Sequence, residues 1–377
     1  MINRAVFLTT ANILDSSGNG GVKASLEHLQ LLQNCLGYEN VSVCIYIKKS
    51  EQRDGNKDYH IFTREENKLK LLFAAVFGCK IYMPWNEKQI VGYLEKYNPD
   101  LLFMDFSLLG RLIRLPHKYK TVVFFHNIEA DYAYNKVKNE GLFYLPSYWA
   151  SKRNDIWASR ADKVICLNER DSGRLYERYG RKADALIPIT FNDRFDISKT
   201  ITNYKREILF LGSLFPPNQN SIEWFIQKVM PLLDNVKLNI VGKGFETKKE
   251  EYEHNRNVHN RNVHVIGSVD DIDTYYYSHC AVVLPILYGA GMKVKTAEAM
   301  MFGRRIFASN EALEGYEVEE IQGITRCNTE IQFATAINHY FQKGIFHAYQ
   351  TDVRNLFMNK YETNKVKSTF IKTINDI

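Results

Sequence analysis

The sequence is 377 residues long, 45% hydrophobic and 24% charged, with a formal net charge of +6. These values lie near the average for soluble globular proteins, so they exclude a disordered or fibrous chain, and the length allows two domains. The positive surplus is small and spread out, which predicts a solvated surface and no nucleic-acid partner.

The sequence contains no run approaching the roughly 18 to 20 apolar residues that a membrane-spanning helix needs. Its start turns polar too early for a signal peptide. We therefore expect a cytoplasmic protein. The six cysteines lack CxxC spacing and mostly stand in apolar runs, which predicts core thiols and no metal site.

The first half of the chain alternates β-like runs with amphipathic segments. The runs are RAVFLTT from Arg4, VSVCIYI from Val41, DLLFMDF from Asp100, TVVFFH from Thr121 and KVICLN from Lys163. This alternation predicts a doubly wound parallel sheet, and hence a Rossmann-like domain over residues 1–190. Residues 191–204 are polar and without period, which indicates a linker.

A second alternation follows the predicted linker. Its runs are EILFLG ending at Gly212, VKLNIVG ending at Gly242, VHVIG ending at Gly267, CAVVLP ending at Pro285 and RRIFAS ending at Ser309, with a helix expected from about Asn218 to Leu233. Most of the runs stop at Gly, Pro or Ser, where ligand loops form on the carboxyl edge of a parallel sheet. We predict an α/β fold of two Rossmann-like domains facing across a cleft, the second over residues 205–351, and a C-terminal helix, 352–377, that crosses back to the first.

The segment GAGMKVKTAEAM, from Gly289 to Met300, indicates an anion site. Glycines let the backbone approach a ligand, and the start of a helix presents N–H groups and a positive dipole end. Lys293 and Lys295 add two cationic groups, whereas Glu298 would repel a phosphate and suits a neutral polyol such as ribose. The alternative is a plain strand–loop–helix connection with solvated lysines and an ion-paired glutamate.

This segment resembles the nucleotide-sugar loop of family-four glycosyltransferases of GT-B fold, which reads approximately G-x-G-T-R-L-K-x-L-E-A in one branch. The matching positions are Gly289, Gly291, Lys293, Lys295, Glu298 and Ala299. The resemblance implies that Glu298 binds the donor ribose and that Gly291, Lys293 and Lys295 hold the diphosphate. Met292 stands where this branch has Thr. The wider family has a second Glu, which touches the transferred sugar, where this chain has Ala290.

ILFLGSLFPPNQNSIEWF, from Ile208, is similar to the opening of the family's C-terminal domain. The resemblance places Gly212 and Ser213 where the first strand turns into the cleft, and Pro217 with Asn218 at a helix start. Many relatives have an Arg and a Lys in this region to hold phosphate, whereas this chain has neither between Gly212 and Gln227, so Lys293 and Lys295 gain importance. The alternative for Gly212 and Ser213 is a simple tight turn.

Two segments of the first half also match the family. Gly20 and Gly21 stand at a helix start after the first strand, and the resemblance implies a loop near the donor phosphate and the acceptor. His126 ends the run FFH, as in the family's Val-His-[Asn/Asp] element, which implies a hydrogen bond to the donor sugar and makes it the catalytic candidate, followed by Asn127 and Glu129. The alternative is a histidine that caps the next helix.

The resemblance therefore implies a glycosyltransferase with a nucleotide-diphosphate sugar as co-substrate, no other cofactor and no metal. It implies retention of anomeric configuration, a saccharide or lipid-linked acceptor, and a place in bacterial surface-polysaccharide assembly. Two segments that mix basic and aromatic residues, 107–120 and 141–160, either lie on an anionic inner membrane surface or are core-facing helices. A sugar-nucleotide epimerase and a non-catalytic partner subunit remain as alternatives.

Overall fold

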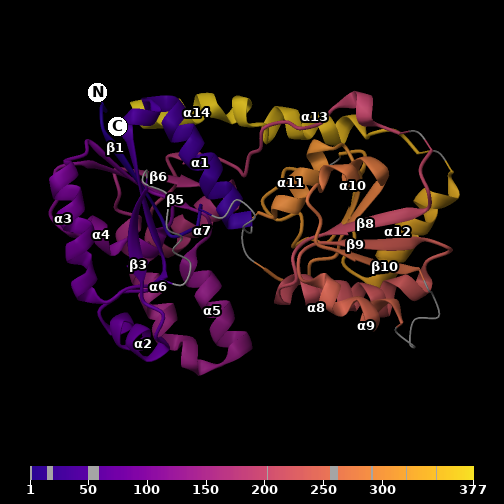
Figure 1. The fold of residues 1–377 in the computed structure, drawn as a ribbon, viewed down its shortest axis with the longest axis horizontal. Helices are drawn as coiled ribbons and strands as arrows, with labels where there is room; N and C mark the ends of the chain where they lie inside the picture. The colour runs from indigo at the N-terminus through magenta and orange to yellow at the C-terminus, as the bar shows by residue number, and fades with distance from the viewer. Residues whose placement is uncertain are drawn as a thin grey trace. The chain divides into compact units, whose positions relative to one another are not determined.

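The computed structural model of the protein describes residues 2–14, 20–49, 59–201, 203–254, 262–289, 292–319, 321–344 and 346–377. The chain divides into two compact units. Unit 1 comprises Met1–Pro188 and Val366–Ile377, and unit 2 comprises Ile189–Lys365. Each unit is an α/β layer structure around one parallel sheet (Figure 1), which confirms the predicted fold class of two Rossmann-like domains.

The sheet of unit 1 has seven parallel strands in the order β3-β2-β1-β4-β5-β6-β7. The three central strands β1, β4 and β5 are almost wholly buried apolar runs, as expected for a sheet covered on both faces. The strands are β1 Ala5–Thr9, β2 Val41–Lys48, β3 Tyr59–Arg64, β4 Leu101–Met104, β5 Lys120–Phe125, β6 Lys163–Cys166 and β7 Ala185–Leu186.

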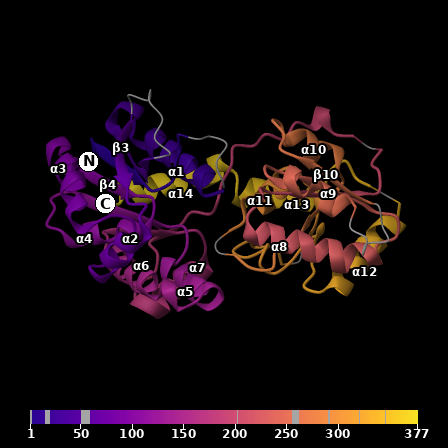
Figure 2. The same ribbon diagram turned by 60° about the horizontal axis from the view of Figure 1, so that its bottom comes forward.

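Helices connect these strands. They are α1 Gly20–Leu36, α2 Lys68–Val76, α3 Glu87–Tyr97, α4 Arg111–Arg114, α5 Glu129–Glu140, α6 Leu145–Ala158 and α7 Glu169–Tyr179. Figures 1 and 2 both show α2, α5 and α6 at the same end of unit 1 and place α1 beside the C-terminal helix α14 (Thr363–Asn375).

Unit 2 contains six parallel strands in the order β10-β9-β8-β11-β12-β13. The strands are β8 Glu207–Leu211, β9 Lys237–Val241, β10 Val263–Gly267, β11 Ala281–Leu284, β12 Arg305–Ala308 and β13 Ile324–Arg326, and the helices are α8 Pro216–Trp224, α9 Lys249–Glu253, α10 Asp273–Ser278, α11 Val294–Met301, α12 Glu330–Gln342 and α13 Thr351–Lys360. The helix expected from Asn218 begins at Pro216, where proline fits the first turn, and continues beyond α8 as a π-helical turn, Phe225–Val229.

The end of the chain is two helices rather than the single helix expected over 352–377. Tyr361 and Glu362 separate α13 from α14, because Glu362 pairs with Phe191 as an isolated parallel bridge. Helix α13 packs on unit 2, where Arg354 donates to the carbonyl of Met301 at 2.9 Å. Helix α14 packs on unit 1, where the ring centroids of Phe370 and Phe103 lie 5.8 Å apart.

The strand order determines where each unit can place a ligand. In both sheets the order reverses beside the first strand, between β1 and β4 in unit 1 and between β8 and β11 in unit 2. Connections at such a switch point diverge and leave a crevice at the carboxyl ends of the strands. Among the described residues, the helices are too short or too polar to span a membrane.

Candidate active site

The glycine turn after β8 forms one side of the unit 2 switch point. Gly212 has φ +157°, and a Cβ built there would lie 2.6 Å from Asn218 Nδ2 and 2.7 Å from Lys295 Nζ. Asn218, near the start of α8, donates from Nδ2 to the carbonyl of Ser213 at 2.8 Å. Ser213 is exposed whereas Asn218 is buried. The backbone of the turn therefore faces solvent, and the side-chain amide of Asn218 lies beneath it.

Lys295 brings a positive charge to this turn from the first turn of α11. Its Nζ donates to Asn218 Oδ1 at 2.5 Å and lies 4.8 Å from the centroid of the Phe210 ring. The pKa of Lys295 is lowered to about 7, mainly by burial; Glu298 partly offsets this decrease and Lys293 adds to it. The structure therefore brings together Gly212, Ser213, Asn218 and Lys295, four residues singled out from the sequence.

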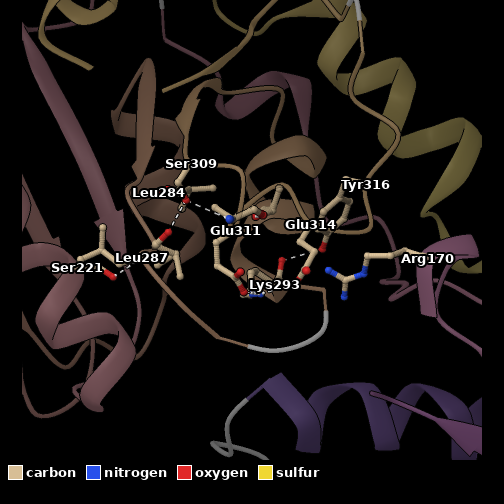
Figure 3. Close-up of polar contacts among 12 residues, drawn as sticks. Arg170, Ser221, Leu284, Leu287, Lys293, Ser309, Glu311, Glu314 and Tyr316 are labelled. Atoms are coloured by element: carbon tan, nitrogen blue, oxygen red, sulfur yellow. Dashed lines mark hydrogen bonds and ion pairs between the residues drawn. The ribbon is translucent and has the colours of Figure 1, made fainter. Parts of the chain in front are cut away.

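Lys293 is placed differently, at the N-cap of α11. Its Nζ donates to Glu311 Oε1 at 2.6 Å and lies 3.6 Å from Glu314 Oε2, as Figure 3 shows. Its carbonyl accepts from the hydroxyl of Tyr316 at 2.7 Å, and a Cβ on Gly289 would approach its side chain to 3.1 Å. Lys293 is thus engaged by two carboxylates, and an incoming anion would have to compete with them.

Glu298 stands one turn further along α11 and is 5% exposed. Its Oε1 lies 3.9 Å from Nη2 of Arg194, whose guanidinium also binds Asp273 through contacts of 3.0 and 3.1 Å. Arg194 falls in the segment predicted as a linker, and it is not among the site residues predicted from the sequence. The oxygens of the Glu298 carboxylate can accept hydrogen bonds from a polyol.

The first residues of the loop between β11 and α11 are hydrogen-bonded to two neighbouring segments. Ser309 donates to the carbonyl of Ile286 at 2.5 Å, and the amide of Leu287 donates to Ser221 at 3.1 Å; Figure 3 shows Ser221, Leu287 and Ser309 around this loop. Met292 is buried. Ala290 and Gly291, both assigned to the donor loop from the sequence, lie outside the described residues. The first turn of α11 carries no acidic residue, which leaves its positive dipole end available to an anion.

The unit 1 switch point holds His126, the catalytic candidate, immediately after β5. His126 is 8% exposed, and its Nε2 lies 3.1 Å from Oδ1 of Asp105, the residue that follows β4. The same oxygen lies 2.7 Å from His28 Nδ1, and Thr9 Oγ1 donates to Asp105 Oδ2 at 3.0 Å. The capping alternative for His126 is wrong, because α5 has Ile128 at its N-cap and no side-chain cap hydrogen bond.

Other residues of the sequence-based site in unit 1 are less engaged with this cluster. Glu129 is buried at the start of α5, where Asn127 donates to it at 2.9 Å, and burial raises the pKa of Glu129. Gly20 and Gly21 open α1, the helix that carries His28. His28 and Asp105 are not among the site residues predicted from the sequence. The acidic residue that interrupts the apolar part of the DLLFMDF run was the available signal for Asp105.

Each switch point, taken by itself, presents groups that suit a particular kind of ligand. In unit 2 a cation, a glycine turn and a helix start suit a phosphate, and a buried carboxylate suits a polyol. In unit 1 a histidine held by an acidic partner suits hydrogen bonding to a hydroxyl.

Solved structures similar over nearly the whole chain define the fold. Sucrose-phosphate synthase from Thermosynechococcus elongatus has a TM-score of 0.70 at 16% identity, covering 99% of this chain and 98% of that one. HepE from Anabaena, in complex with UDP, has a TM-score of 0.69 at 14% identity, covering 99% and 100%. The lipopolysaccharide outer core galactosyltransferase WaaB has a TM-score of 0.68 at 14% identity, covering 99% of both chains. The protein has the GT-B fold.

Comparison of the sequence with protein families gives a match in the second half of the chain. Residues 205–343 match the family model described as Glycosyl transferases group 1. This match over residues 205–343 agrees with the donor-loop resemblance to glycosyltransferases. An uncharacterised 44.6 kDa protein in the cps region of Klebsiella pneumoniae is 26% identical over 250 residues; this match spans 61% of each chain.

Proposed function

We propose that the protein is a glycosyltransferase that moves a sugar from a nucleotide-diphosphate sugar to a saccharide or lipid-linked saccharide acceptor. The observation that carries this proposal is the placement of Lys295 beside the Gly212 turn at the start of α11, with Glu298 one turn further on. Support comes from HepE, whose solved structures hold UDP and UDP-glucose, and from WaaB, which is named a galactosyltransferase.

Each residue has a distinct role in this proposal. Lys295 and the amides at the start of α11 neutralise the diphosphate, and Glu298, beside Arg194, accepts hydrogen bonds from the ribose hydroxyls. His126 hydrogen-bonds the transferred sugar. Lys293 joins the phosphate site after exchanging at least one of its glutamate partners.

The reaction proposed for this site retains anomeric configuration and needs neither a metal nor a further cofactor. The leaving diphosphate takes the proton of the attacking acceptor hydroxyl on the same face of the sugar, so no side chain acts as a nucleophile. The lysine and the helix start stabilise the charge that develops on the diphosphate, which is the role that a divalent ion plays in other transferases.

A donor screen tests the proposal and separates it from its alternatives. Nucleotide sugars are tested one by one for a thermal shift, and those that stabilise the protein are then incubated with it, with and without saccharide acceptors, in the presence of EDTA. We expect acceptor-dependent transfer that EDTA does not abolish. Isomerised donor without acceptor would indicate an epimerase, whereas binding with neither transfer nor hydrolysis would indicate a non-catalytic subunit.

We also propose that unit 1 binds an anionic membrane surface. The first suspected segment, 107–120, turns its Leu109 and Leu112 into the core. The second segment exposes Leu142 (76%), Phe143 and Trp149, beside exposed Lys152. Helix α2 extends this surface with exposed apolar and basic residues, among them Lys68, Leu69, Lys70, Phe73 and Val76.

Helix α2 and residues 141–160 form one surface, called here the α2–α6 surface. Arg153 of α6 donates to the carbonyl of Val76 at 2.6 Å, and Asn154 donates to that of Gly78 at 2.7 Å. Exposed apolar side chains among basic residues are the composition of peripheral membrane surfaces. A membrane site would suit a lipid-linked acceptor in surface-polysaccharide assembly, a setting that the cps-region relative and WaaB also favour.

Vesicle co-sedimentation tests the membrane proposal. The double variant Leu142→Glu/Phe143→Glu should bind vesicles that contain anionic phospholipid at least about tenfold less than the wild type, because it removes apolar area and repels the surface. Ile331→Glu, at an equally exposed position of α12 in unit 2, is the matched control. Equal binding of the double variant and the wild type would refute the proposal.

A further inference from the structure

The Asp105 carboxylate is enclosed by hydrogen-bonding groups from three separate elements. Its Oδ1 lies 2.7 Å from His28 Nδ1 of α1 and 3.1 Å from His126 Nε2 after β5. Its Oδ2 accepts from Thr9 of β1 at 3.0 Å. The hydroxyl oxygen of Thr9 already accepts from the amide of Ala11 at 3.1 Å, which directs the Thr9 proton to Asp105.

An ionised carboxylate has no proton to give, so every group that bonds to it must donate. Burial raises the pKa of Asp105, but the interactions with His126 and His28 outweigh burial and lower the pKa below its usual range. Asp105 is therefore ionised at neutral pH. It follows that each imidazole carries a hydrogen on the nitrogen that faces Asp105, Nδ1 in His28 and Nε2 in His126.

We propose that Asp105 is a positioning residue that fixes His126 as the Nε2–H tautomer, so that Nδ1 offers a lone pair to a hydroxyl of the transferred sugar. The sugar contact rests on the proposed function, whereas the tautomer does not. Ring stacking supports the arrangement: His126 stacks on Phe106 with centroids 4.1 Å apart and planes at 11°, and His28 stacks on Phe124 at 3.8 Å. Stacking on Phe106 thus fixes the plane of the His126 ring, and the hydrogen bond to Asp105 fixes which ring nitrogen carries the hydrogen.

The proposal defines the class of donor sugar. A fixed acceptor favours a sugar with a hydroxyl at the contacted carbon over the corresponding deoxy or O-methyl sugar. Loss of one hydrogen bond of this kind corresponds to a preference of about 10-fold.

The same three side chains are a two-histidine, one-carboxylate set whose ligating atoms all lie within 4.8 Å of one another. Such a set can also bind a divalent metal. The separations of 2.7 and 3.1 Å are, however, ordinary donor–acceptor distances, and the three donors match the lone pairs that the carboxylate offers. Hydrogen bonding therefore accounts for the cluster, and metal binding becomes an outcome of the test.

The experiment uses the full chain labelled with ¹⁵N-histidine and reads the protonation of each imidazole nitrogen by long-range ¹H–¹⁵N correlation. We expect His126 to carry hydrogen on Nε2 in the wild type and to lose this preference in Asp105→Asn. The matched control is Asp155→Asn, because Asp155 is equally buried and hydrogen-bonded, to Ser107 at 2.6 Å and to the amide of Ala130 at 2.9 Å. Its spectrum for His126 should equal that of the wild type.

With a donor identified, Asp105→Asn should lower kcat/KM by about 10- to 100-fold. Hydrogen on Nδ1 of His126 in the wild type would overturn the proposal. Because this result comes from the wild-type spectrum, it tests the proposal even if the variant does not fold. An unchanged spectrum in folded Asp105→Asn would overturn it too, as would one equivalent of divalent metal that the wild type holds and the variant lacks. The expected tautomer without any transfer activity would refute the proposed function and leave the role of Asp105 standing.

Discussion

The two units place polar side chains at the same point of their sheets, where the strand order reverses, but they balance charge differently. In unit 1 the buried charge of Asp105 receives three hydrogen bonds. In unit 2 the charge of Lys295 is met by the neutral amide of Asn218, and burial lowers the lysine pKa to about 7.

This difference indicates what each charge is for. A buried charge with all its hydrogen bonds made contributes to stability and fixes the groups around it. A buried charge with a neutral partner is disfavoured in the unligated fold and gains most from an ionic ligand. We therefore expect mutations at the two switch points to separate stability from ligand binding.

The largest expected effect is on stability. Asp105→Ala leaves Thr9, His28 and His126 without their shared acceptor, and should lower the free energy of unfolding by about 3 kcal/mol. Calorimetry or urea unfolding of the full chain measures this. A loss below about 1 kcal/mol would contradict the view that the unit 1 cluster is stabilising.

The next effect is on ligand affinity. Lys295→Met removes the cation but keeps the aliphatic stem, and should weaken binding of a nucleotide-diphosphate sugar by about 10- to 100-fold. The unligated variant should be as stable as the wild type or more so, because an unfavourable buried charge is gone. Titration calorimetry and urea unfolding give the two values. Lys228→Met, at an exposed lysine of the same unit, is the control and should change neither.

The charge state of Lys295 predicts a pH dependence. Its pKa of about 7 means that the ammonium forms below this pH and is lost above it. An anion favours the charged form, so affinity for a nucleotide-diphosphate sugar should fall by up to about tenfold per pH unit above pH 7, with proton uptake on binding. Calorimetry in buffers of different ionisation enthalpy measures both. Lys295→Arg should bind without the pH dependence, and a flat wild-type profile would contradict the assignment.

The smallest effect is expected at Lys293. Because Glu311 and Glu314 already neutralise its ammonium, Lys293→Ala should weaken nucleotide binding by only about threefold. Glu311→Gln should strengthen binding in an otherwise wild-type chain by releasing the lysine. If Lys293→Ala weakens nucleotide binding as much as Lys295→Met does, the ligand displaces both glutamates from Lys293, and the ranking of the two lysines is wrong.

The sequence predicted the central strands of both sheets and missed three of the four edge strands. The strands that it missed, β3, β7 and β13, all lie at an edge and are only partly buried. An edge strand packs on fewer neighbours, so its sequence carries a weaker apolar signal than that of a central strand such as β4.

The sequence predicted the site residues that stand at the end of one strand or the start of one helix. It did not predict the pairs of residues that are far apart in the sequence. Gly212, Asn218 and Lys295 stand at strand ends and helix starts that the sequence shows directly. The pairing of His28 with Asp105 joins residues 77 positions apart, and that of Arg194 with Glu298 brings a supposed linker to a helix. Such pairs depend on which strands and helices are neighbours, and a single sequence does not contain that information.

The choice of an amide at position 218 has an evolutionary consequence. Asn218 accepts from Lys295 through one atom and donates to the carbonyl of Ser213 through the other. An aspartate there would neutralise the lysine and could no longer donate to Ser213, yet its size would leave the packing almost unchanged. A single such replacement would silence the proposed donor site of a gene copy while the protein continued to fold, which makes position 218 a marker for inactive descendants of this chain.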